Sequence, residues 1–119
     1  MTQTLPAPTL VDPLACAPIG RGSVLTDAEA MALSLRLKAI AEPTRLKIVT
    51  FLIHEPDHEA CTCELAPMVG LTDATVNHHL KVLAAAGIVS KERRGMNVHY
   101  RVSPESMHAI ARALNAGCC

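Results

Sequence analysis

Residues 61–83, CTCELAPMVGLTDATVNHHLKVL, constrain the fold of this chain more than any other segment. A short apolar segment is broken at residues 70–72, and a second helical pattern follows in which Val76, Leu80 and Leu83 line one buried face. The opposite face of this second helix carries hydrogen-bonding side chains. A short helix, a tight turn and a polar-faced second helix predict a helix-turn-helix.

The 119 residues are expected to divide into an extended arm at 1–25, one folded domain at 26–115 and a flexible tail at 116–119. Half of the residues are apolar, but there is one Phe, one Tyr and no Trp, so the core must be aliphatic. No apolar run approaches the roughly 18–20 residues of a membrane span. The first residues lack the basic start and apolar core of a secretory signal, so we expect a cytoplasmic protein without a membrane partner.

The remaining pattern predicts a mainly α domain with a β-hairpin. Helices are expected at about 26–41 and 43–54, a third helix from Cys63 or Glu64, and a fourth helix at 72–86. Residues 88–93 and 96–102 predict a hairpin, and a last helix follows Ser103 and Pro104. A two-stranded ribbon after a helix-turn-helix is a wing, so the predicted fold is a winged helix-turn-helix.

Two helices carry more apolar surface than one small core needs, which predicts a homodimer through the first and last helices. Their apolar faces are formed by Leu33, Leu37 and Ile40 in the first helix and by Met107, Ile110 and Leu114 in the last.

Positive charge gathers where a DNA backbone would touch such a domain. The net charge of the chain is zero, but residues 72–102 hold five basic and two acidic side chains, a local charge of +3. We therefore expect double-stranded DNA as a partner, read by the fourth helix and touched by the wing. The candidate DNA-binding residues are Thr72, Asp73, Thr75, Asn77, His78, Lys81, Arg93, Arg94 and Asn97.

The segments AIAEPTRLKIVTFL, CTCEL, GLTDATVNHHLKVLAAAGIV and RRGMNVHYRV together resemble the ArsR/SmtB family of metal-responsive repressors, over roughly residues 30–115. The resemblance implies a homodimer that leaves operator DNA when an ion binds, and no enzymatic activity. The pair Cys61 and Cys63 resembles the metal-binding box of the arsenic, cadmium and lead sensors, although Glu64 stands where Asp is usual.

The cysteines are the candidate ion ligands. Five cysteines in a cytosolic chain argue against a disulfide framework and for thiolate chemistry. In an extended segment Cys61 and Cys63 point the same way, and a helix N-terminus favours their thiolates. Thiolates select soft ions, and Cys16 on the arm is the natural third ligand, from the partner subunit or from the same chain. Cys118 and Cys119 can chelate the same ion or act as accessory thiols.

Several functions fit these residues. The leading interpretation is a repressor released by arsenite or antimonite, As(III) or Sb(III), which favour three sulfurs. The same repressor could instead sense cadmium, lead or zinc, which favour four donors. A cytosolic arsenite carrier would use the thiols but would need neither the polar fourth helix nor the wing. A thiol-redox enzyme is disfavoured because the chain has no Cys-x-x-Cys motif.

Overall fold

The computed structural model describes residues 24–114, which fall into two compact units. One unit consists of residues 34–103, and the other includes the described residues 24–33 and 104–114. The predicted domain at 26–115 is therefore divided between two units. Most of the predicted arm and all of the predicted tail lie outside the described residues.

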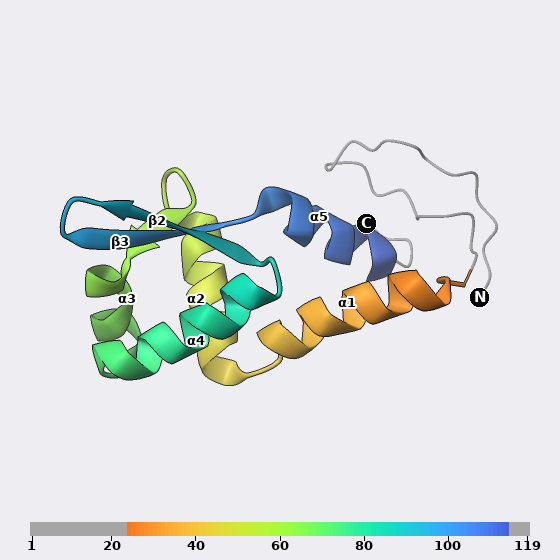
Figure 1. Cartoon of the computed structure of the whole chain (residues 1–119), viewed down its shortest axis with the longest axis horizontal. Helices are drawn as coiled ribbons and strands as arrows, with labels where there is room; N and C mark the ends of the chain where they lie inside the picture. The colour runs from red at the N-terminus through yellow and green to blue at the C-terminus, as the bar shows by residue number, and fades with distance from the viewer. Residues whose placement is uncertain (1–23, 115–119) are drawn as a thin grey trace. The chain divides into compact units, whose positions relative to one another are not determined.

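The first two helices begin where capping side chains predict. Helix α1 spans Asp27–Ile40 and helix α2 spans Pro43–His54 (Figure 1). Before α1, the hydroxyl of Thr26 accepts a hydrogen bond from the Glu29 amide at 3.1 Å, and the Glu29 carboxylate accepts one from the Thr26 amide at 2.9 Å. Before α2, the Glu42 carboxylate accepts from the Arg45 amide at 2.8 Å. These side chains satisfy amide donors that have no partner within the helix.

Helices α3 and α4 form the predicted helix-turn-helix. Helix α3 spans Thr62–Val69 and ends at Gly70, whose φ of 72° is the left-handed conformation that glycine tolerates best. Helix α4 spans Asp73–Ala85, and the Thr72 hydroxyl caps it by accepting from the Thr75 amide at 3.2 Å.

Helix α3 begins one or two residues earlier than predicted. The prediction assumed that Pro67 must lie in the first turn, whereas it is the sixth residue of the helix. Proline has no amide hydrogen, so Pro67 cannot donate to the carbonyl of Cys63 four residues before it. The short helix tolerates this loss inside its second turn.

A three-stranded antiparallel sheet of order β1-β3-β2 packs in the same unit as these helices. Strands β2 (Val89–Arg94) and β3 (Asn97–Val102) form the predicted hairpin, and strand β1 (Glu59–Cys61) pairs with the other edge of β3. The sequence did not predict β1, because three residues are too few to show an alternating pattern. The fold is mainly α with a β-hairpin wing, as predicted for a winged helix-turn-helix.

The core of the 34–103 unit is aliphatic, as the composition predicts. Its fully buried side chains come from α2, α3, α4 and the segment leading into β2: Ile48, Leu52, Leu65, Val76, Leu80, Leu83 and Ile88. On α2, Leu46 is 50% exposed, whereas Ile48 is fully buried. The buried stripe of α4 is the predicted one, so its polar residues face outward.

The first and last helices keep apolar side chains at the surface. On α1 the predicted residue Leu33 is buried, whereas Met31 and Leu35, one turn apart, are 63% and 53% exposed. On α5, which spans Pro104–Leu114, Leu114 is 58% exposed. Between residues 24 and 114, no helix is both long and apolar enough to cross a membrane.

Candidate functional site

The segment Cys61–Thr62–Cys63, here called the cysteine turn, joins the sheet to the helix-turn-helix. Cys61 is the last residue of β1 and the N-cap of α3, and its backbone is extended with φ −89° and ψ 163°. Cys61 is 5% exposed, whereas Cys63 in the first turn of α3 is exposed. This geometry brings one buried and one exposed cysteine to the same end of the helix.

The two sulfurs are joined in a disulfide, whereas the sequence predicted free thiolates. The prediction of an extended Cys61–Cys63 segment is wrong, because only Cys61 is extended and Thr62 and Cys63 begin α3, but the two side chains still meet. The Cα atoms lie 5.1 Å apart, within the range that a disulfide spans. The same proximity serves both forms of the pair, since two sulfurs close enough to bond are close enough to chelate one soft ion after reduction.

Glu64 and Pro67 shape the first turn of α3 around the cysteines. The Cys61 amide donates to Glu64 Oε1 at 3.0 Å, so the carboxylate at this position caps the helix. Pro67 removes the amide that would hold the Cys63 carbonyl. The backbone of Cys61 is therefore held by a side chain, while that of Cys63 has one helical hydrogen bond fewer.

The described part of the chain does not by itself form a cluster of metal ligands. Among residues 24–114, no three His, Cys, Asp or Glu side chains lie close enough together to hold one ion. Cys61 and Cys63 fit a soft ion as two sulfur donors. The other predicted ligands, Cys16, Cys118 and Cys119, lie outside the described residues.

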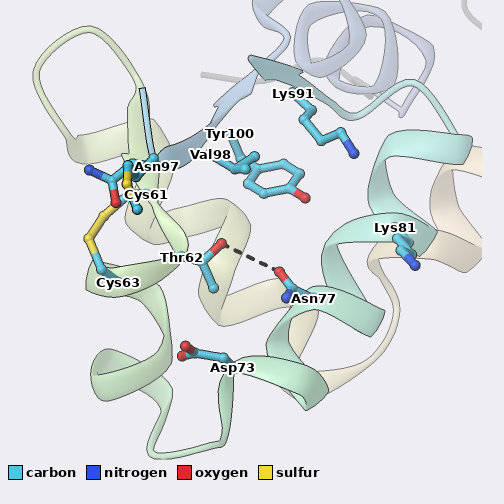
Figure 2. A pocket seen from close by; sticks show the side chains of 11 residues that line it. Cys61, Thr62, Cys63, Asp73, Asn77, Lys81, Lys91, Asn97, Val98 and Tyr100 are labelled. Carbon is cyan, nitrogen blue, oxygen red and sulfur yellow. Dashed lines mark hydrogen bonds between the residues drawn. A yellow bond between two sulfur atoms is a disulfide. The ribbon is translucent and has the colours of Figure 1, made fainter. Parts of the chain in front are cut away.

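A pocket of about 390 Å³ opens between the cysteine turn, α4 and the wing (Figure 2). It brings together predicted ion ligands and predicted DNA-binding residues that are far apart in the sequence. The lining includes Cys61, Thr62 and Cys63, Asp73, Asn77 and Lys81 from α4, and Lys91, Asn97 and Tyr100 from the wing.

Thr62 links the cysteine turn directly to α4. Its hydroxyl donates a hydrogen bond to Asn77 Oδ1 at 3.4 Å, which Figure 2 shows crossing the pocket. Asn77 was predicted to face DNA, and its side chain is exposed. The contact is at the long end of hydrogen-bond geometry, but it connects the residue between the two cysteines to the predicted reading face.

The predicted DNA-reading residues of α4 occupy two neighbouring faces of the helix. Asp73, Asn77 and Lys81 are spaced four residues apart and line the pocket. Thr75 and His78 are exposed and three residues apart, outside the pocket lining. On the buried side, His79 Nδ1 lies 3.2 Å from the guanidinium of Arg45 in α2.

The two wing arginines differ in their surroundings. Arg94 donates to both carboxylate oxygens of Glu59 at 2.8 and 2.9 Å and to Glu92 at 2.8 Å. These hydrogen bonds hold the pKa of the Glu59 carboxyl below its ordinary value and raise that of Arg94. Arg93 is exposed and makes no ion pair with any residue between 24 and 114. Arg94 thus ties the hairpin tip to β1, while Arg93 is available to a partner.

Sequence reasoning missed the structural parts played by Glu59, Thr62 and Tyr100. Thr62 had one visible signal, its position between two cysteines before a helix. Glu59 and Tyr100 depend on β1, because β1 brings Glu59 to Arg94 and places Ala60 opposite Tyr100. The absence of β1 from the predicted elements therefore hid the contact of Glu59 with Arg94 and the pairing of Ala60 with Tyr100.

Comparison with known proteins identifies the family. Residues 42–91 match the family described as bacterial regulatory protein, arsR family. The cadmium resistance transcriptional regulatory protein CadC of Listeria innocua serovar 6a is 35% identical over 78 residues, which cover 66% of this chain and 64% of that protein. The putative arsenical resistance operon repressor ArsR of Halobacterium salinarum is 34% identical, covering 66% of this chain and 60% of that protein.

A solved structure extends the similarity to most of the fold. The antimony-specific transcriptional repressor AntR superposes with a TM-score of 0.64 at 30% identity, covering 77% of this chain and 82% of that one. The chain spans less than two thirds of the length of the CadC and ArsR relatives. The family match, the relatives and the fold agree with the resemblance found in the sequence. This chain belongs to the arsR family of bacterial regulatory proteins, which are regulators rather than enzymes.

Proposed function

We propose that this protein is a metalloregulated transcriptional repressor that binds operator DNA and is released when arsenite or antimonite binds to cysteine thiolates. Helix α4 and the wing contact DNA, and Cys61, Cys63 and Cys16 hold the ion. Relatives named for arsenical resistance and for antimony specificity support this choice of inducer.

The observation that carries the proposal is the position of the cysteine turn against α4. Thr62 lies between both sulfurs and hydrogen-bonds Asn77, and all of these residues belong to the 34–103 unit. A ligand shifts an equilibrium only through its preference for one conformation. An ion that draws the cysteine turn into a new geometry has a direct contact through which to disfavour the DNA-binding form.

The chemistry requires reduced cysteines. Two electrons and two protons convert the Cys61–Cys63 disulfide to two thiols. Each thiol that then binds arsenite transfers its proton to a departing hydroxide, which leaves as water. Cys61 and Cys63 account for two of the three sulfurs that As(III) favours, and Cys16 supplies the third. Because Pro67 leaves the Cys63 carbonyl without its helical amide donor, the first turn of α3 can adjust to the ion.

The test is release of DNA from the reduced protein. A fluorescent duplex is selected from a random-sequence pool, and its anisotropy is followed as arsenite is added after the reductant has been removed. We expect arsenite to weaken binding by about 5–150-fold, the usual range of allosteric coupling. Cys61→Ser and Cys63→Ser should bind DNA as the unmodified protein does and should no longer respond to arsenite.

The remaining cysteines provide matched controls. Cys16→Ser should weaken or abolish release, whereas Cys118→Ser with Cys119→Ser should have the smallest effect. Full release from the Cys61→Ser protein would contradict the assignment of the ion to the cysteine turn.

A second candidate inducer is cadmium, because CadC is 35% identical to this chain. Cadmium favours four donors, so it would need one ligand more than the three proposed sulfurs. Parallel titrations with arsenite and cadmium, followed by sulfur–metal absorption, separate the two. Release by cadmium at lower concentration than by arsenite would favour the cadmium sensor.

The repressor is proposed to act as a homodimer through α1 and α5. The exposed apolar residues Met31 and Leu35 on α1 and Leu114 on α5 provide surface for a second copy. A two-fold dimer places two copies of α4 on half-sites about 34–36 Å apart, so the operator should be roughly palindromic.

A further inference from the structure

Tyr100 is a buried tyrosine whose hydroxyl opens into the pocket beside α4. The residue is only 4% exposed, and Figure 2 shows its oxygen directed into the space between Lys81, Lys91 and Asn77. No residue between 24 and 114 forms a hydrogen bond with this hydroxyl. Buried polar groups in proteins nearly always have a partner, so the hydroxyl of Tyr100 is directed toward a group that residues 24–114 do not provide.

Positive charge surrounds the same space. Lys91 lies directly opposite Tyr100 in the β2–β3 register, so the two side chains share one face of the sheet. Lys81 approaches from α4, one turn beyond Asn77. Neither lysine forms an ion pair within residues 24–114. The acidic residue in the lining, Asp73, lies at the start of α4, and Figure 2 shows it at the opposite end of the pocket from Lys91.

We propose that this pocket binds a backbone phosphate of DNA, with the Tyr100 hydroxyl and Lys91 as its contacts from the wing and Lys81 as its contact from α4. The inference rests on the proposed DNA-binding function and adds two contacts that the reading face of α4 does not include. Two ammonium groups and one neutral hydroxyl donor match an anionic oxygen acceptor. Burial raises the pKa of Tyr100, which keeps the hydroxyl protonated as a donor.

The position of the pocket favours DNA over a free anion. The pocket lies between the helix and the wing that are proposed to straddle the duplex, and it is open to the surface on which Asn77 and Asn97 are exposed. A phosphodiester held between those two elements would fix the register of α4 without reading sequence. The cysteine turn forms another wall, so the proposed inducer would bind beside this phosphate site.

Three variants test the contacts on a random-sequence duplex, because phosphate binding does not depend on sequence. Tyr100→Phe keeps the ring and removes only the hydroxyl, and it should bind about tenfold more weakly, as expected for a lost hydrogen bond to a charged group. Lys91→Gln should make the slope of log affinity against log salt less steep by about 0.9 for each phosphate contact that is lost. Lys47→Gln, which alters an exposed lysine of α2 outside the pocket, should leave the slope unchanged.

A direct probe is available because Tyr100 is the only tyrosine of the chain. Incorporation of 3-fluorotyrosine places a single fluorine at the pocket, and its ¹⁹F resonance can be followed in the reduced protein. We expect the duplex to shift this resonance and inorganic phosphate at equal ionic strength to leave it unchanged. This readout does not depend on how well any variant folds.

The outcomes separate this inference from the proposed function. If the unmodified protein binds the duplex but neither Tyr100→Phe nor Lys91→Gln differs from it, the phosphate site is wrong and the repressor proposal stands. An equal shift with inorganic phosphate would mean a free-anion site and would overturn the inference. If the unmodified protein binds no duplex, both proposals fail.

Discussion

The two arginines at the wing tip, adjacent in the sequence, should contribute to DNA binding in different ways. Both were predicted from the sequence to touch DNA, but Arg94 is held by Glu59 and Glu92 whereas Arg93 has no ion pair in the described residues. To reach a phosphate, Arg94 would have to leave two hydrogen bonds to one carboxylate. We therefore expect Arg93 to contact phosphate and Arg94 to brace the wing.

The expected change in salt dependence on replacing Arg93 follows from counterion release. Each phosphate contact contributes about −0.9 to the slope of log affinity against log salt. A dimer uses each residue twice, so Arg93→Gln should reduce the slope by about 1.8. Between ~50 and ~200 mM salt, the affinity loss caused by Arg93→Gln should therefore shrink by about 12-fold.

The matched comparison is the double variant Glu59→Gln with Arg94→Gln. It removes the brace without changing the net charge of the chain, whereas Arg94→Gln alone also leaves two carboxylates unpaired near DNA. Anisotropy titrations of one duplex at four salt concentrations give the slopes. The double variant should keep the slope of the unmodified protein, and hydrogen exchange at the β2–β3 tip should become faster.

A loss of slope in the double variant as large as that in Arg93→Gln would refute this reasoning. It would mean that Arg94 exchanges Glu59 for phosphate in the complex. An unchanged slope in Arg93→Gln would exclude its phosphate contact in the same experiment.

Two further predictions concern pH and assembly. Arg94 lowers the pKa of Glu59, so the stabilising effect of this carboxylate is present above its ordinary pKa of 4.5 and is lost as the pH falls through the lower folded value. The unmodified protein and Glu59→Gln should therefore differ in hydrogen exchange at the wing near neutral pH. This difference should disappear below about pH 4.5. Leu35→Glu should convert the proposed dimer to a monomer in sedimentation equilibrium, whereas Thr50→Glu, at an exposed position of α2, should not.

The helices and the hairpin were predictable because their signals are local. Thr26 and Glu29 cap α1, Pro43 begins α2, and the positive φ of Gly87 follows the end of α4. The alternation of Tyr100 and Val102 as buried residues also follows directly from the strand period. Each of these features depends on residues within a few positions of one another.

The interactions that assemble the site are not local, and the sequence did not reveal them. Glu59 and Arg94 are 35 residues apart, and Thr62 and Asn77 are 15 apart. Such contacts depend on β1 joining the sheet, which only the folded chain determines. The sequence identified Cys61 and Cys63 as a pair but gave no sign of the disulfide between them.

The four residues from Glu59 to Thr62 explain how one local change can reach both proposed DNA-contacting elements. At one end Glu59 binds Arg94 at the wing, and at the other Thr62 binds Asn77 on α4. Between them, Ala60 pairs with Tyr100 and Cys61 pairs with His99 in β3. The segment therefore touches the wing, the pocket and α4 within a span of four residues. An ion that rearranges Cys61 and Cys63 acts on this segment, so release of DNA requires no long-range pathway through the core.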